Sequence, residues 1–360
     1  MSSILANNKI KLSVFGESHG AAIGCVIDGF PAGIELDFDK IKRDMQRRAP
    51  GRDKTATPRK EADEPIILSG VLNGKTTGAP IAVEIKNTNT KSGDYENISL
   101  VPRPSHSDYP AFVKYGGNND VRGGGHFSGR LTAPIVFAGA LAKQALESHG
   151  VKIAAHIRQI GSVCDERFDY NNINKELLER LETESFGTIS AEAQAKMRAE
   201  IEKARLDGDS VGGIVECAAI GVSGGFGGNM FNTVEGRLSY ALFGIPAVKG
   251  VEFGAGFGLA ERRGSEANDE YELKDGDVAF KSNNNGGVLG GITSGAPIVF
   301  SVAIKPTPSI SKPQASVNLE TNENATLVIN GRHDPCIVPR AVPVVDAAAA
   351  ITLLDILLDN

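Results

Sequence analysis

The chain has 360 residues, of which 41% are hydrophobic and 23% are charged, and its formal net charge is −6 at pH 7. This balance is typical of a folded protein with enough apolar material for one large domain or two medium ones. The negative net charge argues against non-specific binding to nucleic acid or acidic membranes, so an anionic ligand would need a local basic pocket.

Export and membrane insertion are not indicated. A membrane-spanning helix needs about 18 consecutive apolar residues, and the sequence has no such run. Its first residues do not follow the pattern of a signal peptide. The four cysteines, Cys25, Cys164, Cys217 and Cys336, lie far apart without a Cys-x-x-Cys pair. We therefore expect reduced thiols in the cytoplasm and no zinc site.

Segments typical of strands and helices alternate along the chain. Strands are predicted where β-branched and apolar residues cluster, at Lys11–Phe15, Ile23–Asp28, Ile81–Ile85, Ile153–Ile157, Ile214–Ile220, Val248–Phe253, Ile298–Ile304 and Ala325–Ile329. Helices are predicted from the spacing of apolar residues, at Asp39–Arg47, Ala133–Ser148, Asn174–Leu181, Ser190–Leu206, Phe231–Leu242 and Pro343–Leu358. This mixture predicts a fold with both helices and sheets.

Two distant segments of the sequence are similar to each other. Thr76–Thr88 reads TTGAPIAVEIKNT and Thr293–Thr307 reads TSGAPIVFSVAIKPT, and each is a turn followed by a strand that ends in Ile-Lys. Upstream of them, GCVID is similar to GIVEC. A duplicated α+β unit whose halves close on one core would explain the similarity. Chance similarity between two Gly-Ala-Pro strand starts would explain it equally well.

The first candidate site is Gly16–Gly20 (GESHG), which lies between two predicted strands. A histidine in a glycine-flanked turn can present its ring to a ligand, and its pKa suits proton transfer near neutral pH. The same turn could be purely structural, with Ser18 and His19 satisfying backbone groups. Both interpretations stay open at this point.

Basic residues gather at the end of the predicted Asp39–Arg47 helix and in the loop after it. Arginines spaced in this way can converge on a phosphate or carboxylate group. They could equally offset the dipole at the helix C-terminus. The residues are Arg43, Arg47, Arg48, Arg52, Lys54, Arg59 and Lys60.

The segment Arg122–Arg130 (RGGGHFSGR) leads directly into the apolar helix predicted from Ala133. Glycines before a helix N-terminus leave backbone N–H groups free to hold an anion. The segment is neither a P-loop nor a dinucleotide fingerprint. Its arginines, histidine and serine, with the upstream Arg103–Tyr109 (RPSHSDY), favour a phosphate site over a flexible turn.

Two later segments carry similar chemistry. Lys305–Ser309 (KPTPS) leaves a predicted strand with one cation and two hydroxyl groups, and Gly331–Cys336 (GRHDPC) holds an Arg-His-Asp triplet. Such a triplet can bind an anion and accept a proton, although either segment alone could be a surface turn. The histidines do not have the spacing of metal ligands, so we expect no metal.

Together these segments resemble the chorismate synthase family over nearly the whole chain. The similar stretches include Gly16–Gly33, Arg47–Gly51, Ile67–Ile81, Arg103–Tyr109, Gly123–Ala142, Ala247–Phe257, Gly286–Ile298, Lys305–Ser309 and Gly331–Ala350. The resemblance implies an α+β fold, a β-α-β sandwich of the chorismate synthase type that forms a single domain over residues 1–360. It also implies assembly as a homotetramer.

The resemblance implies a lyase that converts 5-enolpyruvylshikimate 3-phosphate to chorismate and phosphate, the last step of the shikimate pathway. This 1,4-anti elimination requires reduced FMN although it involves no net redox change. Because the sequence has no dinucleotide motif and no added reductase domain, we expect an external flavin reductase, with NADPH only as an indirect reductant. The alternative is a flavin- or phosphate-binding protein without turnover, for which a set of proton-handling residues would be superfluous.

Site residues carry over from the family by matching positions. The implied catalytic residues are His19 at the departing phosphate, His106 at reduced FMN near N1, and Asp334 at the flavin N5 proton. The substrate would contact Ser18, Arg48, Arg103, Arg130 and Arg340. FMN would contact His126, Phe127, Ser128, Ala247, Gly290, Lys305, Pro306, Thr307, Pro308, Ser309 and Arg332, and Arg48 also matches a residue associated with NADPH.

The chain departs from the family pattern at three places. His126-Phe127-Ser128 stands where many members have Arg-Ser-Ser or Arg-Ala-Ser, so a titratable or neutral group replaces a cation. Lys54 stands where an arginine is common, which weakens bidentate binding. Asp346 replaces the usual glutamate and shortens that side chain by one methylene.

Overall fold

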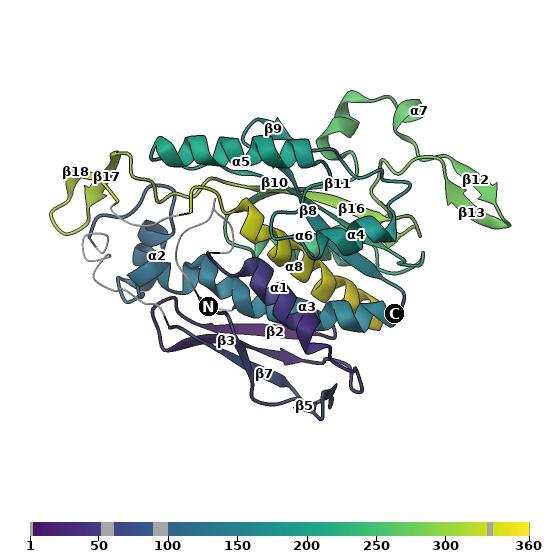
Figure 1. The fold of residues 1–360 in the computed structure, drawn as a ribbon, viewed down its shortest axis with the longest axis horizontal. Coiled ribbons are helices and arrows are strands. Elements are labelled where there is room, and N and C mark those ends of the chain that lie inside the picture. Colours follow the sequence, from purple (N-terminus) through teal and green to yellow (C-terminus); the bar gives the residue numbers. More distant parts are fainter. Residues whose placement is uncertain (1–2, 52–60, 89–99, 330–333, 360) are drawn as a thin grey trace.

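Two antiparallel five-stranded sheets enclose a layer of helices in the computed structural model, which describes residues 3–51, 61–88, 100–329 and 334–359 (Figure 1). The N-terminal sheet has the order β1 (Ile4–Ala6), β2 (Lys11–Gly16), β3 (Ala22–Asp28), β7 (Ile81–Lys86) and β4 (Pro65–Ile67). The second sheet has the order β11 (Val248–Phe253), β16 (Ile298–Ile304), β10 (Gly213–Ile220), β8 (Lys152–Ile160) and β9 (Val163–Cys164).

The helical layer lies between the sheets and holds most of the core. It consists of α1 (Phe38–Arg48), α3 (Thr132–Glu147), α6 (Val234–Phe243) and α8 (Val338–Asp359) (Figure 1). Helices α3 and α8 pack against each other; α3 contacts β3 of the first sheet, and α8 contacts β8 and β10 of the second. Two further helices, α4 (Lys175–Leu181) and α5 (Ala191–Leu206), lie against the second sheet. This arrangement confirms the predicted α+β fold and its β-α-β sandwich.

The remaining elements project from the two sheets or connect them. They include α2 (Asp108–Tyr115), α7 (Gly264–Ala267) and the hairpins β5–β6 (Val71–Leu72, Lys75–Thr76), β12–β13 (Tyr271–Lys274, Asp277–Phe280), β14–β15 (Val288–Leu289, Ile292–Thr293) and β17–β18 (Gln314–Asn318, Glu323–Leu327). Short 3-10 turns are η2 (Arg122–Phe127), η3 (Gly129–Leu131), η4 (Met230–Asn232) and η5 (Gly256–Glu261).

The two similar sequence segments occupy equivalent places in the two sheets. One forms β7, which pairs with β3 at Cys25 opposite Val83, and the other forms β16, which pairs with β10 at Cys217 opposite Phe300. A short hairpin precedes each strand, β5–β6 before β7 and β14–β15 before β16. Chance similarity would not require matching neighbours, so the topology favours a duplicated unit.

The predicted core strands and most helices match the observed ones within one to three residues, and the differences at two helix starts have local causes. Helix α6 starts at Val234 rather than Phe231, because the Thr233 side chain caps it by accepting a hydrogen bond from the Gly236 N–H. Helix α8 starts at Val338 rather than Pro343, with Pro339 in the first turn, where the missing N–H costs nothing.

By length and composition alone, helix α8 could cross a membrane, because its most apolar 18-residue stretch has a mean hydropathy of 2.0. However, 89% of that stretch is buried inside the fold. Its two internal aspartates are paired: Asp346 contacts Arg47 at 3.2 Å and Lys143 at 2.7 Å, and Asp355 pairs with Arg237. Buried charges need such partners, so α8 is the central core helix.

A second buried polar cluster lies within the second sheet. His156 of β8 is fully buried, with Nδ1 at 3.3 Å from Asp165 and Nε2 at 3.1 Å from Glu216. Tyr170 donates its hydroxyl hydrogen to Glu216 at 2.9 Å. Burial lowers the pKa of His156, but the hydrogen bonds to its two carboxylate partners outweigh this effect and leave the pKa above its usual value.

Candidate functional site

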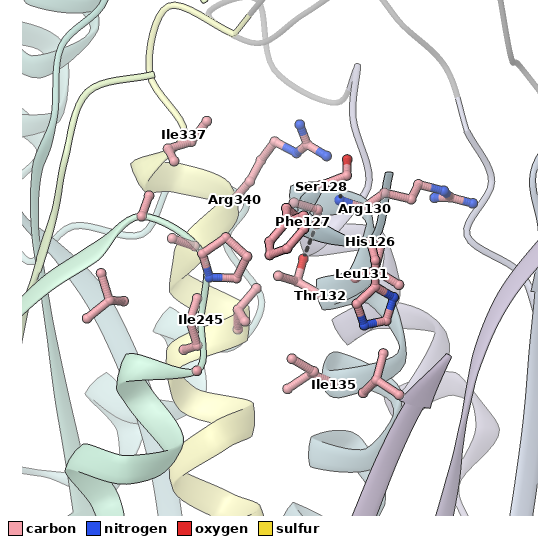
Figure 2. Close-up of a pocket in the computed structure, with 18 of the residues that line it drawn as sticks. His126, Phe127, Ser128, Arg130, Leu131, Thr132, Ile135, Ile245, Ile337 and Arg340 are labelled. Atoms are coloured by element: carbon pink, nitrogen blue, oxygen red, sulfur yellow. Dashed lines mark hydrogen bonds between the residues drawn. The ribbon is translucent and has the colours of Figure 1, made fainter. Parts of the chain in front are cut away.

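A cavity of about 840 Å³ opens where the N-terminal sheet meets the first turns of α3 and α8 and the segment between α6 and β11. Figure 2 shows His126, Phe127 and Ser128 before α3 facing Ile337 and Arg340 at the start of α8. One part of the wall is apolar and includes Leu12, Val14, Leu131, Ile135, Phe243, Ile245 and Val344. Five cations of the described part of the chain also line the cavity: Arg48, Arg130, Lys249, Lys305 and Arg340.

The glycine-rich turn before α3 passes between two histidines. Gly123, Gly124 and Gly125 have φ values of 58°, 84° and 54°, a region that only glycine adopts easily. A Cβ atom at Gly123 would lie 2.3 Å from the His19 ring, and one at Gly124 would lie 3.4 Å from the ring of His106. The missing side chains therefore let the backbone approach both histidines closely.

His106 belongs to a compact hydrogen-bonded network at the start of α2. Its Nδ1 lies 2.6 Å from Oδ1 of Asp108, and Arg103 donates to the same carboxylate from Nε at 2.7 Å and from Nη2 at 2.8 Å. Arg103 also donates from Nη1 to Oγ of Ser309 at 3.2 Å. The network thus connects the RPSHSDY and KPTPS segments, which lie 200 residues apart in the sequence.

The network lowers the pKa of both of its titratable groups, His106 and Asp108. Burial together with the charges of Arg103 and Lys305 lowers the pKa of His106 below its usual value, against the opposing effect of Asp108. Burial raises the pKa of Asp108, but the hydrogen bonds from Arg103 and His106 outweigh it, and the pKa lies far below its usual range. At neutral pH the carboxylate is therefore ionised and the imidazole is neutral.

The predicted substrate arginines are held by buried carboxylates. Asp63 accepts a hydrogen bond from Nη1 of Arg48 at 2.5 Å and pairs with Arg130, which also contacts Glu61 at 2.7 Å. Arg340 pairs with Asp334 and donates from Nε to the Arg48 carbonyl oxygen at 3.1 Å. These contacts fix the guanidinium groups at one end of the cavity before any ligand binds.

Most of the predicted site residues come together at this cavity. Those that line it are Ser18, Arg48, His106, His126, Phe127, Ser128, Arg130, Ala247, Lys305, Thr307, Pro308, Ser309, Asp334 and Arg340. His19 and Arg103 do not line it but contact residues that do. Pro306 and Gly290 do not line it either, and Gly290 lies in the turn of the β14–β15 hairpin. Arg332 and Lys54 fall outside the described residues.

His126 uses both ring nitrogens within the protein. Nδ1 lies 2.7 Å from the carbonyl oxygen of Gly16, and Nε2 lies 2.5 Å from Oγ of Ser3. The carbonyl oxygen can only accept, so Nδ1 carries the proton and Nε2 accepts the hydrogen bond from Ser3. The His126 ring therefore connects β2 to the N-terminal segment.

Several residues of the site were not found from the sequence. Asp108 follows His106 by two residues within the RPSHSDY motif. A carboxylate so close to a histidine could have identified it as a hydrogen-bond partner of that histidine. Lys249 lies within the Ala247–Phe257 stretch, and it lines the cavity. Nothing in the sequence distinguished Glu61 or Asp63 from the other acidic residues, because their role depends on arginines distant in the chain.

The fold places cationic side chains and histidines around one cavity, an arrangement suited to an enzyme that acts on a small anionic molecule. The family model for chorismate synthase matches residues 10–358. Chorismate synthases from Thermococcus kodakarensis and Pyrococcus abyssi are 51% and 50% identical to the chain, each covering 97% of it and 96% of the relative. A solved chorismate synthase structure superposes with a TM-score of 0.77 at 31% identity, over 98% of this chain and 93% of that one.

The chain belongs to the chorismate synthase family. Members of this family are lyases that catalyse the last step of the shikimate pathway. The predicted family and class of enzyme are thereby confirmed.

Proposed function

We propose that this chain converts 5-enolpyruvylshikimate 3-phosphate to chorismate and phosphate with reduced FMN bound in the cavity. The observation that carries the proposal is the gathering of five cations around one cavity in a chain of net charge −6. The substrate carries a phosphate and two carboxylates, and FMN adds another phosphate. A site for both must therefore concentrate positive charge locally.

The residues present fit a flavin. The cavity volume of about 840 Å³ lies in the upper part of the range for ligand sites. Its apolar wall suits a planar ring system, while Lys249 and Lys305 can approach a phosphate. The Thr307 Oγ1 atom is buried and has no hydrogen-bond partner among the described residues, so a ligand oxygen would satisfy it. When bound, reduced FMN supplies the electronic chemistry for cleaving a stable C–H bond, which side chains lack.

We assign the FMN contacts to residues 126–128, Ala247 and residues 305–309, with Gly290 and Arg332 retained from the family pattern. The structure gives these contacts unequal support. Lys305, Thr307, Pro308 and Ser309 line the cavity, and Pro306 does not. His126 would contribute by holding the wall in place rather than by its own nitrogens, since both are engaged.

The chain's own residues would bind, orient and exchange protons. Arg48, Arg130 and Arg340 offer guanidinium groups to the carboxylates and phosphate of the substrate. In the elimination, the C–O bond to phosphate breaks with its electron pair leaving on the phosphate. The 1,4-related carbon loses a proton to a basic group of the loaded site, and the electron pair of that C–H bond forms a new C=C bond as the ring double bond shifts. Cationic groups stabilise the negative charge on the departing phosphate.

We place proton transfer at three groups. His106 reaches the cavity with its ring, and Asp334 lies in the wall beside Arg340. His19 lies behind Gly123, next to Ser18, which does line the cavity. We therefore place the departing phosphate at the end of the cavity that Ser18 lines, because His19 is the next residue in the chain.

We further propose that residues 1–360 act as a single cytoplasmic domain that assembles into a homotetramer and depends on an external flavin reductase, with NADPH only as an indirect source of electrons. One apolar cluster extends from Ile10 to Ile356 and draws on both sheets, which supports a single domain. Met230, Phe231 and Phe257 are 79%, 98% and 83% exposed, which supports burial against other subunits.

The test is anaerobic product formation from 5-enolpyruvylshikimate 3-phosphate with photoreduced FMN, beside an oxidised-FMN control. We expect chorismate and phosphate only with reduced FMN. His106→Ala should retain FMN binding and lose most turnover, whereas His149→Ala, which removes an exposed histidine after α3, should retain both. FMN binding without product in the wild type would overturn the proposal and favour a non-catalytic binder. Steady aerobic product with NADPH and oxidised FMN would overturn the dependence on an external reductase.

A further inference from the structure

Asp108 is a buried carboxylate beside the His106 ring, and neither the sequence motifs nor the proposed mechanism gives it a role. Its side chain is 6% exposed, at the first residue of α2. It accepts hydrogen bonds from Nε and Nη2 of Arg103 and from the Arg103 backbone N–H at 3.1 Å. With three donors from one residue, the carboxylate cannot rotate away from the His106 ring beside it.

The hydrogen bond to Asp108 fixes the proton on the imidazole. Nδ1 of His106 lies 2.6 Å from Oδ1 of Asp108 and 3.1 Å from Nη2 of Arg103. If Nδ1 were unprotonated, its lone pair would face an ionised carboxylate oxygen at 2.6 Å, which is repulsive. If Nδ1 carries the proton, it donates to Asp108, and Arg103 donates to the same oxygen at 2.8 Å. Only this second assignment satisfies all three groups.

The other ring nitrogen is then the one available to a ligand. In the neutral ring with a proton on Nδ1, Nε2 is an acceptor, and no described residue forms a hydrogen bond with it. The turn at Gly124 lies alongside, where a Cβ would be 3.4 Å from Nε2. His106 lines the cavity, so a donor or acidic group of a bound molecule can reach this nitrogen.

We propose that Asp108 is a positioning residue that holds His106 with Nδ1 protonated and thereby makes Nε2 the nitrogen that accepts and returns a proton in the cavity. Arg103, which the family pattern assigned to the substrate, acts here by clamping Asp108. The inference rests on the proposed function for the identity of the molecule that meets Nε2. The orientation of the His106 ring and the position of its proton follow from the contacts with Asp108 and Arg103, whatever the function.

Among the described residues, three charged groups face the His106 ring: Asp108 from α2, Arg103 from the preceding loop, and Lys305, which follows β16. Two are cations that disfavour a protonated imidazole, and Asp108 alone opposes them. Removing the charge of Asp108 should therefore move the titration of His106 to lower pH. It should also remove the preference for the Nδ1 proton, because an asparagine side chain can turn either its oxygen or its NH₂ group toward the ring.

The test is ¹⁵N NMR of the full-length protein labelled at histidine, with the His106 signals identified by their loss in His106→Gln. We expect the wild type to show the Nδ1-protonated tautomer and a midpoint below 6.5. Asp108→Asn should lower that midpoint and mix the two tautomers. Asp120→Asn is the matched control, because it removes another carboxylate paired with an arginine, Arg122, at 2.8 Å, and it should leave the His106 signals unchanged.

Kinetics then separate positioning from binding. With reduced FMN, Asp108→Asn should lower kcat on the order of 10–100-fold, the range for partners that orient a working histidine, with KM within about threefold, and Asp108→Glu should recover part of the loss. An Nε2-protonated tautomer in the wild type would overturn the inference without any variant. Unchanged His106 signals in a folded Asp108→Asn protein would also overturn it. Failure of the proposed function would appear separately, as no chorismate from the wild type while the NMR result stands.

Discussion

Replacing Gly123 by alanine tests whether the glycine-rich turn sets the position of His19. The new Cβ would lie 2.3 Å from Cε1 and Nδ1 of His19 and 2.8 Å from Oγ of Ser18. Ordinary contact begins near 3.4 Å, and the difference from 2.3 Å means that the ring or the turn must move by about 1 Å. A displacement of about 1 Å in an active site can lower the rate about 100-fold. The φ of 58° adds a backbone cost of about 1–2 kcal/mol.

Gly33→Ala is the matched control for this variant. Gly33 has a φ of 83°, and a Cβ added there would have nothing within 4 Å of it, so the variant has the same backbone cost without a clash. Urea unfolding should show both proteins folded, each having lost about 1–2 kcal/mol from the backbone conformation. In the anaerobic assay with reduced FMN, kcat/KM should be about 100-fold lower for Gly123→Ala than for Gly33→Ala. Equal activities would refute the reasoning that this close approach positions His19 for the reaction.

Two further predictions concern buried charges. Asp63→Asn leaves Arg48 and Arg130 without their shared carboxylate, so the free energy of unfolding in urea should fall by about 3–5 kcal/mol. Inorganic phosphate should restore part of this stability. A fall of less than about 1 kcal/mol would contradict the prediction. The pKa of His156 is raised on folding, so its contribution to stability is complete below about pH 6.5 and is lost as pH rises through the folded pKa. The unfolding free energy of the wild type should fall over that range, and the same fall in His156→Gln would count against this assignment.

The sandwich and its main elements could be predicted because the signals are local. β-branched runs such as Ile298–Ile304 and the apolar helix from Ala133 carry their periodicity within a few turns, and both were observed almost as predicted. The β5–β6 and β14–β15 hairpins and α2 were missed for the same reason, since two-residue strands and an eight-residue helix have no periodicity to detect. Their positions are set by tertiary contacts, such as the bond from Lys305 to the Ser105 carbonyl oxygen.

The residue types of the site could be predicted better than their hydrogen-bond and ion-pair partners. The cations, histidines and glycines stood out because each residue type is itself the signal, and most of them meet at the cavity. The partners of these groups could not be predicted. Arg103 has the charge of a substrate ligand, yet its donors are used by Asp108 and Ser309. His126 has the chemistry of a ligand contact, yet both its nitrogens bond within the protein. Residue type indicates what a side chain can do, and only the fold determines which partner it has.

The division of charge within the cavity follows from these pairings. At the α8 end, the three arginines of the described residues, Arg48, Arg130 and Arg340, pair with three carboxylates, Glu61, Asp63 and Asp334. Within the described residues, that end therefore presents oriented donors whose charges are paired, which favours recognition of a ligand by geometry. Lys249 and Lys305 form no ion pair with a described residue, so the excess positive charge lies at their end. A ligand with several anionic groups is attracted by the lysines and oriented by the arginines, and this separation lets an acidic chain hold a polyanion without a large unbalanced cluster of buried cations.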